Sequence, residues 1–214
     1  MGTERILTIA AGTVAMLGLM LFQRKRYPSV AVWKLPVISV ILTVCGVLGT
    51  MLLFFLENGR FGGTSFFGAV LLVPLLMLPA LLLRISYGTL MDLCAAAECA
   101  MLAIMKIDCL RSGCCQGVMM ENLGFRFPSQ IVEMIAALAI MVILVVLGKQ
   151  QKNRGKLYPL YLMFYGGSRF ILNWFREDIA PYFWQLPPGN YWALISVGIG
   201  FAWLVFLRRK ERVA

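Results

Sequence analysis

Three polar side chains stand at the entrance to a long apolar run. Arg126, Gln130 and Glu133 open the segment "RFPSQIVEMIAALAIMVILVVL", which covers residues 126–147. A guanidinium group can hold a phosphate through two parallel hydrogen bonds. A carboxylate can neutralise such a cation or accept a proton. Because charge is costly in apolar surroundings unless it is paired or functional, the segment predicts an anion-binding site at the mouth of an apolar helix.

Further cations accompany this segment. Arg169 lies inside a second apolar run, with Tyr165 one turn further in and Asn173 one turn further out. Residues four apart share a helical face, so we expect this polar stripe to face the interior of the molecule. Lys106 follows another apolar run. Together with Arg126 and Arg169 it could stabilise the negative charge that develops on a departing phosphate.

Each feature also has a purely structural explanation. Gly59 and Gly63 have a four-residue spacing that is common in helix packing. The side chains of Arg126 and Arg176 could extend to the membrane interface, and Glu133 could form a structural ion pair. A functional site is favoured because four polar segments, distant in the sequence, converge on one face of the membrane in the topology predicted below.

The elements that position these residues are predicted to be transmembrane helices. Of the 214 residues, 60% are hydrophobic and 14% are charged, which is typical of an integral membrane protein. Apolar runs near the ~20 residues that cross a bilayer recur throughout. We predict an all-α protein with one membrane domain (1–214) and about seven spans, the third kinked by Pro74 and Pro79. The spans are 6–22, 35–56, 66–83, 87–105, 130–147, 157–175 and 191–207.

The basic residues predict the orientation. Most of the 20 Lys and Arg residues fall in alternate loops, which the positive-inside rule assigns to the cytoplasm. The N-terminus is then outside and the C-terminus cytoplasmic. Glu4 and Arg5 cancel before the first apolar run, so we expect a retained span and not a cleaved signal peptide. The net charge of +10 then reflects topology and attraction to anionic lipid, and it does not indicate nucleic-acid binding.

The six cysteines fall into two groups. Those within predicted spans are expected to be small packing residues: Cys45, Cys94 and Cys99. The others share an outer loop as Cys109, Cys114 and Cys115, without a histidine anywhere in the chain. Because this spacing is not a usual zinc pattern, we expect no metal site and no cofactor. A disulfide between Cys109 and either neighbour remains open.

Six motifs in order resemble one family. They are "GGTSFFGA", "DLCAAA", "KIDCLRSGCCQG", "RFPSQIVE", "YGGSRFILNWFRED" and "LPPGNYWALISVGIG". This set resembles the prolipoprotein diacylglyceryl transferases, over about residues 62–200. The resemblance implies a multi-pass enzyme of the bacterial cytoplasmic (inner) membrane. It would move a diacylglyceryl group from phosphatidylglycerol to the cysteine thiol of a lipoprotein precursor at the outer leaflet, releasing glycerol phosphate.

The resemblance also implies roles for individual residues. Arg169 matches the family's essential arginine after a Tyr-Gly pair, and residues 128–133 match its Pro-Ser-Gln-x-x-Glu motif. Arg176 and Asp178 match the polar end of the sixth span. We predict catalytic roles for Arg169, Lys106 and Glu133. We predict contacts with phospholipid for Arg126, Ser129, Gln130, Tyr165, Arg176, Gly62, Gly63, Ser65 and Asn173.

Several positions depart from the family pattern. The motif histidine falls on Phe67, and the chain has no histidine. An arginine, a glycine, an asparagine, a glutamate, a histidine and a glutamate of the family are replaced, in that order, by Lys106, Asp108, Cys109, Cys114, Phe127 and Asn173. Loss of a general base typically costs ~10²- to 10⁴-fold in rate, although neighbouring cations also favour thiolate. Glu133 is the candidate proton acceptor.

These departures leave three functions open. The first is a transferase of the family type. The second is a related transferase with a different acceptor, and the third is a non-catalytic accessory membrane protein that binds phospholipid.

Overall fold

The computed structural model describes residues 3–121, 124–177, 186 and 188–213. Within these residues the chain forms seven α-helices and a two-stranded antiparallel hairpin. The helices are α1 (Thr3–Gln23), α2 (Lys34–Asn58), α3 (Phe66–Leu76), α4 (Tyr87–Ser112), α5 (Ser129–Leu147), α6 (Leu157–Leu172) and α7 (Pro188–Val213). The strands are β1 (Met119–Met120) and β2 (Phe125–Arg126).

Each α-helix coincides with one predicted span. Among the described residues, four helices are long and apolar enough to cross a membrane, namely α1 with its following turn, α2, α5 and α7. The shorter α3 stops at Leu76 and the chain resumes as a 3₁₀ helix, Leu78–Leu83, with Pro79 in its first turn. The predicted kink therefore takes the form of a break. An all-α membrane protein is supported, while seven spans and their orientation stay predictions.

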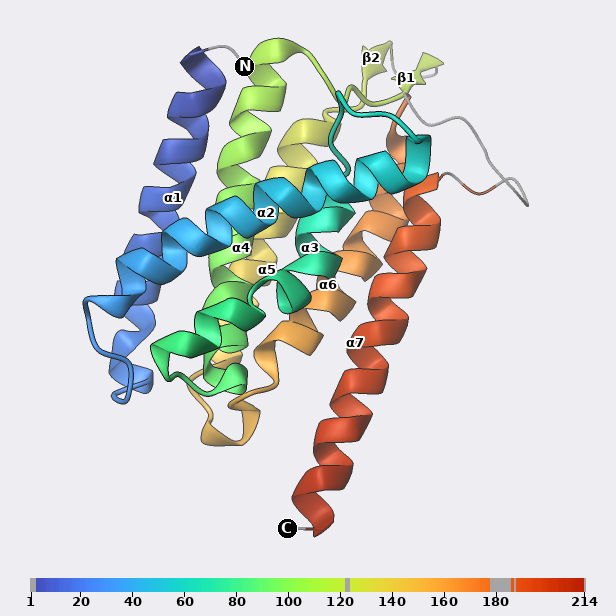
Figure 1. Cartoon of the computed structure of the whole chain (residues 1–214). Coiled ribbons are helices and arrows are strands. Elements are labelled where there is room, and N and C mark those ends of the chain that lie inside the picture. The colour runs from blue at the N-terminus through green and yellow to red at the C-terminus, as the bar shows by residue number, and fades with distance from the viewer. Residues whose placement is uncertain (1–2, 122–123, 178–185, 187, 214) are drawn as a thin grey trace.

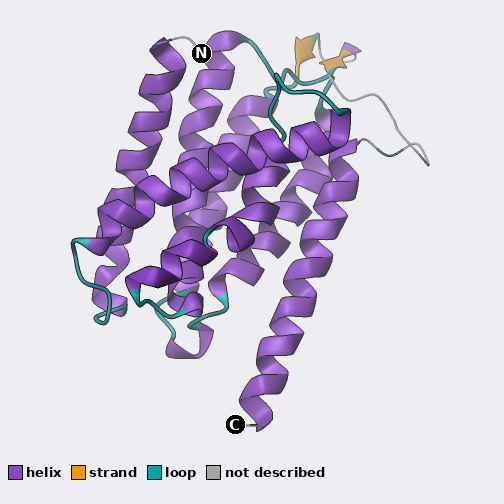
Figure 2. Ribbon diagram, in the orientation of Figure 1, coloured by secondary structure: helices purple, strands orange, loops and turns teal. Residues whose placement is uncertain are grey.

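The helices form a bundle around α4. This helix packs against α1, α5 and α6, while α2 packs on α3 and α6 on α7. Figure 1 shows α2 crossing obliquely in front of the bundle, and Figure 2 shows that loops and strands lie mainly at its two ends. The hairpin lies at the same end as the N-terminus, and the C-terminus lies at the opposite end (Figure 1).

The central position of α4 follows from its small side chains. Ala95, Ala96 and Ala97 are fully buried, because alanine allows neighbouring helices to approach closely. The helix begins where the hydroxyl of Ser86 accepts a hydrogen bond from the Thr89 N–H. It ends at Gly113, whose φ of 66° is left-handed and suits glycine. The helix thus carries its last turn to the end of the bundle where the hairpin lies.

Asp92 joins α4 to two distant segments. Its carboxylate accepts hydrogen bonds from the hydroxyl of Tyr27 at 3.1 Å and from the backbone N–H groups of Gly155 at 2.6 Å and Leu157 at 2.9 Å. The side chain is fully buried, so these donors satisfy a group that apolar surroundings would otherwise disfavour. Asp92 therefore acts as a packing partner that holds the start of α6 against α4.

The crossing of α2 and α3 depends on a pair of glycines. A Cβ on Gly68 would lie 2.0 Å from the carbonyl oxygen of Gly49. We expect Gly68→Ala to force the helices apart and to lower the free energy of unfolding by about 1–3 kcal/mol. Thermal unfolding in detergent measures this effect. Gly18→Ala in α1 is the matched control, because a Cβ there meets nothing within 4 Å. Equal melting temperatures for the two variants would contradict the close approach.

Candidate functional site

Four charged side chains from three segments meet at the hairpin end of the bundle. The carboxylate of Glu133 on α5 pairs through Oε2 with Lys106 of α4 and with Arg169 of α6. Its Oε1 lies 3.7 Å from the guanidinium of Arg176, which follows α6. We call Lys106, Glu133, Arg169 and Arg176 the cation cluster. Sequence analysis named all four, and the fold brings them together.

The cation cluster is buried and carries excess positive charge. Glu133 is 3% exposed, Lys106 8% and Arg169 9%. Three cations surround one carboxylate, so these four residues have a formal charge of +2. Buried charge is costly unless it is compensated. Lys106 and Arg169 share a single carboxylate oxygen, so the arrangement is suited to an additional anion such as a phosphate group.

Glu133 has more than one partner, and this bears on its chemistry. The sequence suggested it as a proton acceptor. In the structure its carboxylate oxygens are already engaged by Lys106 and Arg169 and lie close to Arg176. The geometry favours a different role, in which Glu133 gathers cations from α4 and α6 and fixes their positions.

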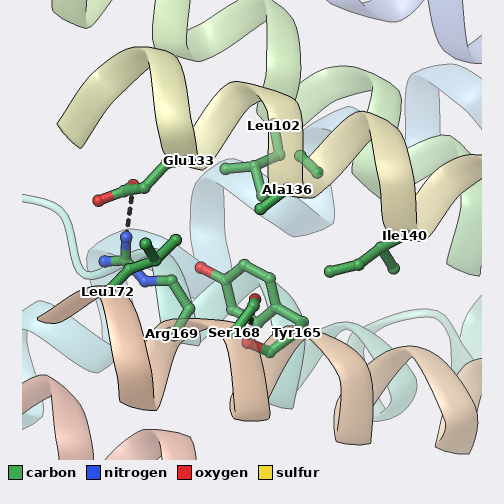
Figure 3. A pocket seen from close by; sticks show the side chains of 9 residues that line it. Leu102, Glu133, Ala136, Ile140, Tyr165, Ser168, Arg169 and Leu172 are labelled. Carbon is green, nitrogen blue, oxygen red and sulfur yellow. Dashed lines mark hydrogen bonds and ion pairs between the residues drawn. The ribbon is translucent and has the colours of Figure 1, made fainter. Parts of the chain in front are cut away.

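Arg169 retains hydrogen-bonding capacity. Its NH1 group contacts Glu133, whereas its buried Nε has no hydrogen-bond partner among the described residues. Figure 3 shows Glu133 and Arg169 facing each other from α5 and α6. A small recess beside them is lined by Leu102, Glu133, Ala136, Ala137, Ile140, Tyr165, Ser168, Arg169 and Leu172. The site thus combines a spare donor with apolar walls.

Tyr165 and Asn173 flank Arg169 along α6. Tyr165 is 2% exposed and packs edge-on against Phe67, with ring centroids 5.5 Å apart. Asn173 donates a hydrogen bond to the side chain of Asn190 at 2.9 Å, which ties the end of α6 to α7. All three members of the predicted polar stripe are therefore buried. Asn173 is engaged with a neighbouring helix, whereas Tyr165 lines the recess.

The loop between α4 and β1 is held by the start of α5. The hydroxyl of Ser129 donates to the carbonyl of Cys115 at 2.5 Å, and the amide of Gln130 donates to the carbonyl of Cys114 at 2.7 Å. Further along, Gly117 forms a β-bridge with Arg176. These contacts position the loop beside the cation cluster, so Ser129 and Gln130 act on the site through the backbone.

Arg126 lies at the rim of the site. It pairs with Glu177 and donates to the side-chain carbonyl of Gln116 at 2.6 Å. Its side chain is 42% exposed and that of Glu177 is 49% exposed, so solvent weakens this pair. Arg126 is therefore a partly exposed cation, and its contact with phospholipid stays a prediction. Asp178, also singled out from the sequence, lies outside the described residues.

Three predicted ligands belong to the loop before α3. Gly62 has a φ of 123°, which favours glycine. A Cβ on Gly63 would overlap the ring of Phe54 in α2, and the Ser65 hydroxyl donates to Glu57 of α2 at 3.0 Å. These contacts shape the loop against α2. Phe67, where the resemblance implies a histidine, contacts Tyr165 with an apolar ring.

The structure adds features that sequence reasoning missed. The Sγ atoms of Cys109, Cys114 and Cys115 all lie within 4.8 Å of one another. A hydrogen bond from the Cys109 thiol lowers the pKa of Cys115 to about 5, and the charges of Arg176 and Lys106 act in the same direction. The Cys-x₄-Cys-Cys spacing held the signal, but only the turn after α4 shows that the three sulfurs converge.

The chain is similar in sequence to known proteins. The sequence model of the family described as prolipoprotein diacylglyceryl transferase matches residues 6–206. A curated relative from Helicobacter pylori (strain HPAG1), named phosphatidylglycerol–prolipoprotein diacylglyceryl transferase, is 29% identical over 100 residues. The matched stretch covers 45% of this chain and 36% of the relative.

Proposed function

Because the chain belongs to the prolipoprotein diacylglyceryl transferase family, we propose that it transfers a diacylglyceryl group from phosphatidylglycerol to a cysteine thiol of a lipoprotein precursor. The observation that carries this proposal is the cation cluster, in which three cations share one buried carboxylate. Phosphatidylglycerol offers a phosphodiester anion at the membrane surface, and its acyl chains suit the apolar side chains that line the recess beside Glu133 and Arg169.

The proposed reaction is a displacement at an sp³ carbon. A thiolate attacks the diacylglyceryl CH₂ carbon, so a C–S bond forms while the C–O bond to phosphate breaks. The leaving group is glycerol phosphate, and the thiol releases its proton to water. Negative charge grows on the leaving phosphate, and cations fixed beforehand in a dry site lower the barrier most effectively. Arg169, Lys106 and Arg176 supply these cations, while Glu133 holds them in place.

The family arginine replaced by Lys106 changes the grip on phosphate. Arginine binds two oxygens through a planar fork, whereas lysine offers a compact charge. Lys106 is oriented by Glu133, so it keeps the attraction with less geometric control. Arg126 at the rim guides the headgroup. The site is proposed to open on the outer leaflet of a bacterial inner membrane, as the family and the predicted orientation suggest.

Direct transfer tests this function. Purified protein is incubated with phosphatidylglycerol labelled in its acyl chains and with a peptide that carries the lipobox cysteine. We expect label and a diacylglyceryl mass to appear on the peptide, and glycerol phosphate to be released. Phosphatidylethanolamine should be a poorer donor, because its headgroup has no net charge. Absence of transfer from protein that binds phosphatidylglycerol would contradict the proposal.

Two alternatives come from specific residues. Phe67 replaces the family histidine and packs on Tyr165, which favours a phospholipid-binding protein without catalysis. The cysteine-rich loop beside the cluster replaces polar family residues, which favours a transferase with a different acceptor. A thiol peptide of another sequence, or a hydroxyl compound, can be offered in the same assay. Transfer to one of these alone would identify the second alternative.

A further inference from the structure

Three thiols form a compact group beside the cation cluster. Cys109 lies in the last turn of α4, and Cys114 and Cys115 follow the end of that helix. Their sulfurs lie within 4.8 Å of one another, and all three cysteines are free. The spacing Cys-x₄-Cys-Cys gave no reason to expect a metal. In the folded chain the turn at Gly113 brings Cys114 and Cys115 back to Cys109, so the three sulfurs lie close enough to share a metal ion.

The backbone that closes this gap is specifically supported. Gly113 turns the chain in the left-handed region, and the N–H of Cys114 returns to the carbonyl of Cys109 at 3.2 Å. Cys115 also has a positive φ, 58°, a conformation that non-glycine residues adopt at a cost and that is enriched at functional sites. Hydrogen bonds from Ser129 and Gln130 to the adjoining carbonyls maintain it.

The sulfur positions fit a zinc ion. Zn–S bonds are about 2.3 Å long, which places the sulfurs of a tetrahedral site roughly 3.8 Å apart. The three sulfurs lie within 4.8 Å of one another. Small changes in the side-chain torsions would bring them to the spacing of a zinc site. Three thiolates and Zn²⁺ carry a net charge of −1. Gly117, two residues after Cys115, forms a β-bridge with Arg176, so a cation of the cluster lies beside the loop that would hold this anionic centre.

We propose that Cys109, Cys114 and Cys115 bind a zinc ion whose fourth position receives the acceptor thiol. This inference rests on the proposed transferase function and supplies what the chain lacks. The chain has no histidine, and Glu133 is occupied by three cations. Zinc in a site with three protein ligands keeps one position open for substrate, and a coordinated thiol is deprotonated outright.

The chemistry balances without an oxidant. The acceptor thiol binds zinc and releases its proton to water. Its sulfur then forms the C–S bond as the C–O bond to phosphate breaks. The cation cluster stabilises the negative charge on the departing glycerol phosphate. The zinc stays divalent throughout. A thioether is a weaker ligand than a thiolate, so the product leaves and the fourth position is available again.

Two other fates of these cysteines are less well supported. A disulfide would use two of the sulfurs and leave the third without a role, whereas all three converge. Soft thiolate ligands also bind Cu(I), but three thiolates around Cu(I) would carry a charge of −2 and would not activate an incoming thiol. A zinc ion would bind all three sulfurs and would keep its fourth coordination position open beside the cation cluster.

Metal content gives a readout that does not depend on activity. The full chain, purified in detergent under reducing conditions, is expected to contain one zinc ion per protein molecule. Inductively coupled plasma mass spectrometry measures this content. Cobalt(II) added to chelator-treated protein should give thiolate-to-cobalt absorption. Cys109→Ser and Cys115→Ser should lose both signals. Cys45→Ser is the control, because Cys45 lies in α2 and donates to the Leu76 carbonyl, far in sequence from the loop.

The results separate the zinc site from the transferase function. Removal of zinc should lower transfer by about 10²- to 10⁴-fold, the usual size of a proton-transfer contribution, and added zinc should restore it. Bound zinc without any transfer would sustain the site and overturn the transferase. Transfer that persists in chelator-treated protein, stoichiometric copper, or a disulfide within this loop after purification without reductant would overturn the zinc proposal alone.

Discussion

Arg169→Ala is expected to lower the rate of diacylglyceryl transfer by about 10²- to 10³-fold, the usual effect of losing one preorganised group that stabilises developing charge. Arg169 is buried, reaches Glu133 through one nitrogen, and retains a buried Nε without a partner in the described residues. Its remaining donors can therefore meet a phosphate. Initial rates with labelled phosphatidylglycerol at saturating peptide measure the loss.

Two further variants make this experiment specific. Arg111→Ala removes the same charge from an exposed position in the last turn of α4, and it should leave the rate within about twofold because surface charges contribute little. Arg169→Lys should recover part of the activity, since it restores charge without the planar fork. The role assigned to Arg169 is wrong if Arg169→Ala and Arg111→Ala transfer at the same rate.

The second large effect is expected from Glu133→Gln. Removing one partner of a buried ion pair typically destabilises a protein by about 3–5 kcal/mol. Here three cations would lose their shared counter-charge. We expect a clear fall in the melting temperature in neutral detergent. Phosphatidylglycerol added to the micelles should raise the melting temperature more in the variant than in the parent protein. The reason is that the lipid phosphate replaces the carboxylate charge that the variant has lost.

Glu177→Gln is the matched control for this change. It removes a carboxylate from the exposed pair with Arg126, and such pairs contribute only about 0–1 kcal/mol. If Glu133→Gln does not fold, the double variant with Lys106→Gln should recover, because one excess cation is then removed. Equal melting temperatures for Glu133→Gln and Glu177→Gln would contradict the buried cluster. If the double variant does not recover stability, the loss caused by Glu133→Gln is not electrostatic in origin.

The sequence by itself determined where the helices are. Uninterrupted apolar runs have few alternatives in a membrane, because every backbone group must be hydrogen-bonded within the segment. The predicted ranges therefore agree with the helices of the structure, and Pro79 marks the break after α3. The charged residues of the cluster could also be named, because charge inside apolar runs is rare and therefore informative.

Tertiary packing decided which of these residues act together. Helices that are apolar on most sides carry little information about which face meets which neighbour, so the sequence could not show that Lys106 and Arg169 share one oxygen of Glu133. The same holds for Ser129 and Gln130, which contact the loop backbone.

The turn after α4 is the clearest case. The sequence places Cys109 four residues from the next cysteine, and that separation alone allows many sulfur positions. Left-handed backbone at Gly113 and Cys115, stabilised by donors from α5, selects one of them. The sequence thus determined which reactive groups are present in this turn. Their distances were set by contacts between segments that are remote along the chain, because only those contacts fix the helix rotations and the path of the loop.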